Sequence, residues 1–124
     1  MAKNILIIDD EELITKSLIK LLRSRGYVAS LSVGGAEALE KIKTEDFDLI
    51  ICDVRMPGMD GIETIKTIRA YLEKSDKKSI PEVLITGYAD AEKYESAIDL
   101  EVADYLYKPF DNDEFLHIVR KTIG

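Results

Sequence analysis

The chain has 124 residues and a mass of 14.0 kDa, which suits one globular domain, since a single core usually takes roughly 100 to 200 residues. Hydrophobic residues make up 46% and charged residues 33%, a balance that excludes disordered and fibrous chains. Lys and Arg total 17 against 24 Asp and Glu, and the net charge of −7 has the wrong sign for neutralising nucleic-acid phosphates. We therefore expect one domain over residues 1–124 that does not itself bind nucleic acid.

Membrane and disulfide-rich proteins are excluded on similar grounds. The longest apolar runs, Ile5–Ile8 and Leu49–Cys52, are far shorter than the roughly 20 residues that span a bilayer. Acidic residues begin at Asp9, before the apolar region of a signal peptide could be complete. Cys52 is the only cysteine, so an internal disulfide and a cysteine metal cluster are both excluded. A cytoplasmic protein without membrane contact is expected.

Two hydrophobic patterns alternate along the chain. Short apolar runs are typical of strands, and apolar residues recurring every three or four positions are typical of helices. The expected strands are Ile5–Ile8, Tyr27–Leu31, Leu49–Cys52, Val83–Ile85 and Tyr105–Tyr107. The expected helices carry their apolar faces at Ile14 to Leu22, Ala38 to Ile42, Ile62 to Leu72, Ala91 to Ile98 and Phe115 to Ile123.

Helix boundaries and strand composition then indicate the fold class. Asp60 and Asp111 each precede a Glu by three residues, which is typical of a capped helix start, and Gly26 lies where the first helix should end. Several strands are apolar on both faces, as a parallel sheet covered by helices on both sides requires. We predict a (βα)5 α/β fold, a three-layer sandwich with right-handed crossovers.

Polar residues gather where the expected strands end. Asp9 and Asp10 follow the first strand, Asp53 the third, Thr86 the fourth and Lys108 the fifth. In an open α/β sheet these ends share one edge, where ligands bind. Clustered carboxylates disfavour one another's ionisation, so a cation should share the site. Carboxylates without His or Cys suit Mg²⁺, with Mn²⁺ as a substitute.

A divalent ion with few protein ligands leaves room for a phosphoryl group, which Lys108 and Thr86 could contact from the other side. Asp53 is the candidate nucleophile because its strand should lie centrally, whereas Asp9 and Asp10 suit metal binding. Phosphorylation of Asp53 would give an acyl phosphate.

Four motifs in this order resemble the receiver domain of two-component response regulators, and the resemblance covers essentially the whole chain. They are Ile5-Leu-Ile-Ile-Asp-Asp-Glu11, Asp53-Val-Arg-Met-Pro-Gly-Met-Asp-Gly61, Thr86-Gly87 and Tyr105-Leu-Tyr-Lys-Pro-Phe110. The resemblance implies a flavodoxin-like sheet in the order 2-1-3-4-5 with five helices. It also implies a regulatory phosphoacceptor domain rather than an enzyme acting on other substrates.

The resemblance implies a role for each site residue. Asp53 would take a phosphoryl group from a sensor histidine kinase, a phosphotransfer protein or a small acyl-phosphate donor. Asp9 or Asp10 would bind Mg²⁺, directly or through water, together with Asp53 and the backbone carbonyl of Arg55. Lys108 would pair with the phosphoryl oxygens.

The resemblance further implies a conformational switch. The Thr86 hydroxyl would move to the phosphoryl group and the Tyr105 ring would follow inward, and the peptide bond before Pro109 would be cis. The readout surface would comprise the helix ending near Ile98, the strand at Tyr105–Tyr107 and the last helix. It would act on an output domain or target protein, or form a homodimer.

Three positions stand out against the family pattern. Glu101 replaces a usual Gly before the fifth strand, and Glu tolerates a left-handed backbone less well. Arg55 and Tyr88, two residues after Asp53 and Thr86, flank the expected phosphate and should tune hydrolysis.

Two other protein classes share this architecture. A hydrolase of the haloacid dehalogenase type would need a second acid two residues after the nucleophile, where this chain has Arg55. A flavodoxin-like electron carrier would need a Ser/Thr/Gly-rich phosphate loop after the first strand, where the chain has carboxylates instead.

Overall fold

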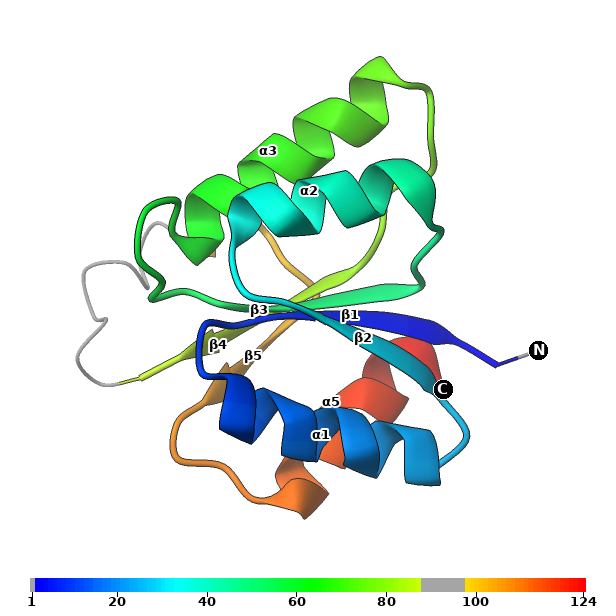
Figure 1. The fold of residues 1–124 in the computed structure, drawn as a ribbon, viewed down its shortest axis with the longest axis vertical. Coiled ribbons are helices and arrows are strands. Elements are labelled where there is room, and N and C mark those ends of the chain that lie inside the picture. The colour runs from blue at the N-terminus through cyan, green and yellow to red at the C-terminus, as the bar shows by residue number, and fades with distance from the viewer. Residues whose placement is uncertain (1, 88–97) are drawn as a thin grey trace.

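The fold is built on a five-stranded parallel sheet in the order β2-β1-β3-β4-β5 (Figure 1). The computed structural model describes residues 2–87 and 98–124. The strands are β1 (Asn4–Ile8), β2 (Val28–Ser32), β3 (Leu49–Asp53), β4 (Glu82–Thr86) and β5 (Asp104–Tyr107). The predicted parallel sheet and its strand order are confirmed.

Four helices are complete within the described residues: α1 (Glu12–Ser24), α2 (Gly35–Thr44), α3 (Gly61–Lys74) and α5 (Asn112–Ile123). The fourth expected helix, at Ala91 to Ile98, falls mostly on residues 88–97, outside the described ranges, and within the described residues only Ile98 and Asp99 are helical there. Within residues 2–87 and 98–124, no helix combines the length and apolar composition that crossing a bilayer requires.

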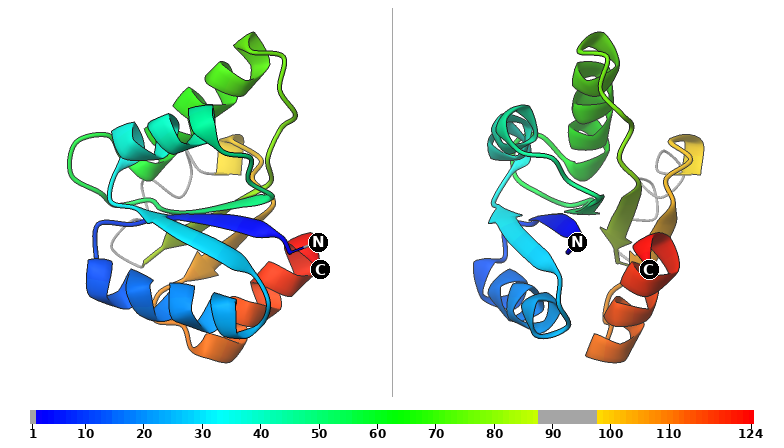
Figure 2. Two further views of the ribbon diagram at one scale, coloured as in Figure 1. Left: turned by 45° about the vertical axis from the view of Figure 1, so that its right-hand side comes forward. Right: turned by 90° about the vertical axis from the view of Figure 1, so that its right-hand side faces the viewer.

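The helices form two outer layers, with α2 and α3 on one face of the sheet and α1 and α5 on the other (Figures 1 and 2). Successive strand residues point to opposite faces, so β1 contributes to both cores. Leu6 and Ile8 pack in the cluster under α2 and α3, whereas Ile5 and Ile7 pack under α1 and α5. This explains why the central strands are apolar on both faces, and it confirms the three-layer α/β sandwich.

The predicted helix boundaries are also confirmed. The Asp60 carboxylate accepts a hydrogen bond of 2.9 Å from the backbone N–H of Glu63, and Asp111 accepts one of 2.8 Å from that of Glu114. These bonds satisfy N–H groups that have no partner inside the helix. Gly26 follows α1 with a φ of 90°, a conformation that favours glycine.

The strands reach slightly further than the hydrophobic runs predict. Asp53 and Thr86 are the last residues of β3 and β4 rather than the first residues beyond them. The backbone explains the difference, because Asp53 pairs with Ile85 in the ladder and the Val54 N–H donates to the Ile85 carbonyl at 2.9 Å. The ladder therefore continues through polar residues and fixes their backbones at the edge of the sheet.

Candidate functional site

Three carboxylates meet at the carboxyl edge of the sheet, as the sequence predicts. One oxygen from each of Asp9, Asp10 and Asp53 lies within 4.8 Å of the others. Asp9 and Asp53 are each only 2% exposed, whereas Asp10 lies at the surface. The cluster therefore combines two carboxylates held out of water with one that faces it.

Asp53 is held from both sides. Its Oδ2 atom lies 2.9 Å from the Nζ atom of Lys108, and its Oδ1 atom accepts a hydrogen bond of 3.0 Å from the backbone N–H of Arg55. The backbone of Lys108 is fixed in turn, because its N–H donates to the Thr86 carbonyl at 2.8 Å. The ends of β3, β4 and β5 thus place Asp53, Thr86 and Lys108 together.

The charge balance at the edge is uneven. Burial raises the pKa of Asp9 to about 6, and the charge of Asp53 adds to this, although a hydrogen bond from the Glu11 N–H works against it. Burial alone would lower the pKa of Lys108, but its hydrogen bond and charge interaction with Asp53 outweigh burial and raise it. Lys108 thus stays charged, yet it does not neutralise the whole cluster.

Glu11 contributes a contact that the sequence did not indicate. Its carboxylate lies 3.3 Å from the Nζ atom of Lys108, so the ammonium is shared between Glu11 and Asp53. Glu11 was visible in the sequence only as one of several acids after the first strand. Its pairing depends on the path of the chain between β5 and α5, which the sequence pattern does not specify.

The donor set fits a hard divalent cation. The cluster offers carboxylate oxygens, and the elevated pKa of Asp9 reflects electrostatic cost that a bound cation would relieve. The one nearby thiol, that of Cys52, is buried, and burial followed by the charge of Asp53 raises its pKa well above the ordinary value. A thiolate ligand, which zinc sites favour, is therefore not available from Cys52.

The Thr86 hydroxyl is buried at the carboxyl end of β4, the strand that pairs with β3. Thr86 is 2% exposed, and its Oγ1 atom has no hydrogen-bond partner within residues 2–87 and 98–124. A buried hydroxyl without a partner costs free energy. The hydroxyls of Ser30 and Ser32 share this condition, but they lie on the edge strand β2. Thr86 alone of the three ends a strand that pairs with β3, at the end where Asp53 lies.

A hollow of about 770 Å³ opens above the acidic edge. Asp9, Asp53 and Lys108 line its polar part, and Ile14 and Phe110 line its apolar part. The peptide bond between Lys108 and Pro109 is cis, as expected. The hollow therefore leaves room for a ligand beside Asp53.

The remaining predicted residues are placed as follows. Tyr105 is the second residue of β5 and packs partly buried against the cluster under α2 and α3. Glu101 has a φ of 53°, so the left-handed backbone expected at this position is confirmed. The backbone N–H of Arg55 donates to the Asp53 carboxylate. Tyr88 lies outside the described residues.

The comparison with protein families decides the assignment. Residues 5–120 match the family described as the response regulator receiver domain. The chain belongs to this family. It is a receiver domain of the kind found in the response regulators of two-component systems.

Individual relatives agree with the assignment. The receiver domain is 40% identical over 111 residues to the transcriptional regulatory protein ZraR of Klebsiella oxytoca, an alignment that covers 90% of this chain and 24% of that protein. It is 33% identical over 118 residues to the DNA-binding transcriptional regulator NtrC of Escherichia coli, covering 95% of this chain and 24% of that protein. The chain thus spans about a quarter of the length of these relatives.

A solved structure gives the same result for the fold. The chemotaxis protein CheY4 of Vibrio cholerae superposes on the receiver domain with a TM-score of 0.86 at 30% identity, covering 98% of this chain and 99% of that one. Of the three protein classes considered from the sequence, the receiver domain is therefore the one supported.

Proposed function

We propose that this receiver domain, spanning residues 1–124, accepts a phosphoryl group on Asp53 and converts it into a change of surface. The donor is the phosphohistidine of a sensor histidine kinase or phosphotransfer protein, or a small acyl phosphate. The observation that carries the proposal is the buried Asp53 carboxylate, which lies within the acidic cluster and 2.9 Å from Lys108. The domain promotes its own phosphorylation and dephosphorylation and acts on no other substrate.

Asp9, Asp10, Asp53 and the backbone carbonyl of Arg55 would hold Mg²⁺, for which Mn²⁺ could substitute. When bound, the ion neutralises carboxylate charge and offers coordination positions to phosphoryl oxygens. Asp9 supports this proposal because its carboxylate is buried and has an elevated pKa. Asp10, which faces solvent, can contribute directly or through water.

The transfer step uses Asp53 as nucleophile. A carboxylate oxygen of Asp53 attacks the phosphorus atom, the bond from phosphorus to the donor breaks, and the donor leaves with the bonding electron pair. In-line transfer of this kind depends on positioning and on charge neutralisation more than on a general base. Lys108, already at the carboxylate, stabilises the charge on the phosphoryl oxygens.

Phosphorylation is read out through Thr86 and Tyr105. The buried Thr86 hydroxyl has no hydrogen-bond partner among the described residues, and a phosphoryl oxygen on Asp53 would provide one. Movement of Thr86 towards that oxygen leaves space that the Tyr105 ring fills. Shifting a two-state equilibrium from 1:99 to 99:1 needs about 5.5 kcal/mol of differential interaction, which several charge-assisted hydrogen bonds can supply.

The partners follow from this role. The surface formed by the helix that ends near Ile98, by β5 and by α5 would act on an output domain or target protein, or pair with a second copy. With a net charge of −7, the domain would leave DNA binding to other parts of a regulator. Signalling of this kind takes place in the cytoplasm.

The decisive experiment is phosphorylation by a small acyl-phosphate donor, followed by the intact mass of the protein. We expect one added phosphoryl group when Mg²⁺ is present and none after chelation. Asp53→Asn is the key variant, because it keeps the shape of the side chain but removes the nucleophile, and it should gain no mass.

A second acid serves as a matched control. Asp48 has an exposed carboxylate that accepts a hydrogen bond from the backbone N–H of Asn4, at the edge of the sheet opposite the acidic cluster. Asp48→Asn should therefore be phosphorylated like the wild type. Phosphate found on a Ser or Thr, or retained in Asp53→Asn, would refute the proposed function.

A further inference from the structure

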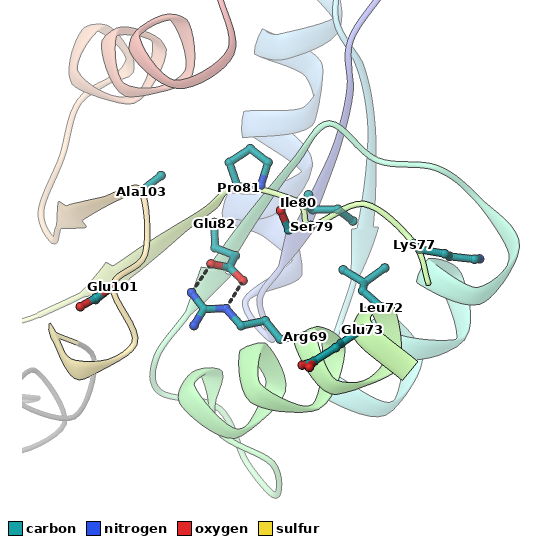
Figure 3. Close-up of a pocket in the computed structure, with 10 residues that line it drawn as sticks. All are labelled: Arg69, Leu72, Glu73, Lys77, Ser79, Ile80, Pro81, Glu82, Glu101 and Ala103. Carbon is teal, nitrogen blue, oxygen red and sulfur yellow. Dashed lines mark hydrogen bonds and ion pairs between the residues drawn. The ribbon is translucent and has the colours of Figure 1, made fainter. Parts of the chain in front are cut away.

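Figure 3 shows an ion pair between Arg69 and Glu82, in which the carboxylate is buried and the guanidinium is partly exposed. Glu82 lies at the start of β4, whereas the acidic cluster lies at the ends of the strands. The Glu82 side chain is only 7% exposed. Arg69, on α3, faces it with two parallel contacts: Nε to Oε2 at 2.8 Å and Nη2 to Oε1 at 2.6 Å. Such a bidentate pair between a guanidinium and a carboxylate fixes the orientation of the two groups as well as their distance.

The same guanidinium holds the chain that leads into β5. Its Nη1 atom donates to the backbone carbonyl of Leu100 at 2.7 Å. Two residues after Glu101, the Ala103 N–H donates to the carbonyl of Glu82 at 2.8 Å. In Figure 3, Glu101 and Ala103 lie on the far side of the ion pair from α3. The pair therefore ties α3, the start of β4 and residues 98–103 together.

The tied segment contains a strained residue. Glu101 has a φ of 53°, which a side chain of this type disfavours, and it follows directly after Leu100. A conformation of this kind persists only when neighbouring contacts hold it. The Glu101 N–H donates to the Ile98 carbonyl at 3.0 Å, and the hydrogen bonds to the Leu100 carbonyl and from the Ala103 N–H fix the residues on either side.

The segment also shares its packing with Tyr105. Leu100 is buried in the cluster under α2 and α3, and Val102 and Tyr105 pack against the same cluster. Because protein interiors are close-packed, the ring of Tyr105 cannot move further inward unless its neighbours shift. A bond that fixes Leu100 thus resists movement of Tyr105.

We propose that Arg69 is a positioning residue of the switch, which holds residues 98–103 in the unphosphorylated arrangement through Glu82 and the Leu100 carbonyl. The inference rests on the proposed function, because it concerns the movement of Tyr105. Loss of the tie should raise the population of the switched state. Any ligand that prefers that state then binds more tightly.

The test measures the affinity for beryllofluoride, a tetrahedral mimic of the phosphoryl group, in the presence of Mg²⁺. Amide resonances of residues 98–107 report binding, and urea unfolding reports stability in parallel. The main variant combines Arg69→Met with Glu82→Leu, because removing Arg69 alone would leave a buried charge without a partner. Arg69→Lys is the second variant, to be used if the first does not fold. It keeps a cation opposite Glu82 but cannot make the bidentate contact and the bond to the Leu100 carbonyl together.

Leu22→Ala is the control for a loss of stability alone. Leu22 is fully buried on α1 in the cluster under α1 and α5, on the opposite face of the sheet from Leu100 and Tyr105, so its truncation lowers stability without opening space beside either residue. We expect the Arg69 variants to bind beryllofluoride roughly threefold or more tightly than the wild type, and Leu22→Ala to bind like the wild type.

The two hypotheses fail in different ways. If the wild type binds beryllofluoride through Asp53 and the Arg69 variants have unchanged or weaker affinity, the tie is only structural and the inference is wrong. If the wild type does not bind beryllofluoride, or if Asp53→Asn binds it equally well, the proposed function itself is wrong.

Discussion

A Cβ atom on Gly61 would lie 2.3 Å from the backbone carbonyl oxygen of Asp53. It would also lie 2.7 Å from the Cα atom of Val54, closer than real Cβ atoms approach. The first residue of α3 thus packs directly on the backbone of the candidate nucleophile. Only glycine allows this approach, and so Gly61 contributes to the position of Asp53.

Gly61→Ala should therefore destabilise the domain by about 1–3 kcal/mol in urea unfolding, the usual range for overpacking. This loss should occur although alanine is the better helix former by about 1 kcal/mol. Mg²⁺ affinity, measured by calorimetry, should also fall because the Asp53 backbone is displaced. Gly34→Ala, where a Cβ atom would meet nothing within 4 Å, should cost less than about 1 kcal/mol. Equal losses in the two variants would contradict the argument.

Asp9→Asn should stabilise the metal-free protein in a pH-dependent way. The pKa of Asp9 rises from 3.8 to about 6 on folding because burial disfavours its charged form. The folded state thus binds the proton more tightly, and stability is lost as pH rises from about 4 to about 6. Two pKa units correspond to about 3 kcal/mol. The variant should gain up to that amount at pH 7 and almost nothing at pH 4.

Urea unfolding across this pH range, in a chelator, measures the effect. The exposed neighbour provides the control, since Asp10→Asn should change stability by less than about 0.5 kcal/mol throughout. Both variants should bind Mg²⁺ more weakly at pH 7. A gain for Asp9→Asn that does not depend on pH would show that the charge of Asp9 is not its cause.

The meeting of Asp9, Asp10 and Asp53 could be predicted in two steps. The hydrophobic pattern places all three at the carboxyl edge of a parallel sheet, and the resemblance to receiver domains supplies the strand order that makes β1 and β3 neighbours. The ion pair of Glu82 could not be predicted in this way. Glu82 looks like a polar residue before a strand, and its partner lies 13 positions earlier on α3. Which helical residue faces a strand start depends on the packing of α3 against the sheet. The same holds for the sharing of Lys108 between Asp53 and Glu11.

Glu101→Gly should stabilise the domain. A left-handed backbone costs a residue with a side chain about 1–2 kcal/mol, and glycine removes this cost. Glycine also makes the unfolded chain more flexible, which lowers the free energy of unfolding by about 0.4–1 kcal/mol. The net gain should be about 0.5–1 kcal/mol in urea unfolding. Asp76, with a φ of 55°, allows a matched comparison. Because Asp tolerates this conformation better, Asp76→Gly should gain clearly less, and equal gains would argue against strain at Glu101.

Thr86→Val should affect the unphosphorylated protein and the ligand-bound protein in opposite directions. The Thr86 hydroxyl is buried and has no hydrogen-bond partner in the part of the chain that the structure describes, so its removal should raise the free energy of unfolding by about 1 kcal/mol. Affinity for beryllofluoride should fall, because the valine cannot donate to the bound group. Thr64→Val is the counterpart, since the buried Thr64 hydroxyl donates to the Asp60 carbonyl at 2.8 Å. That variant should lose about 1 kcal/mol of stability. A comparable loss in Thr86→Val would mean that its hydroxyl already has a partner before phosphorylation, and Thr86 could not then gain one from the phosphoryl group.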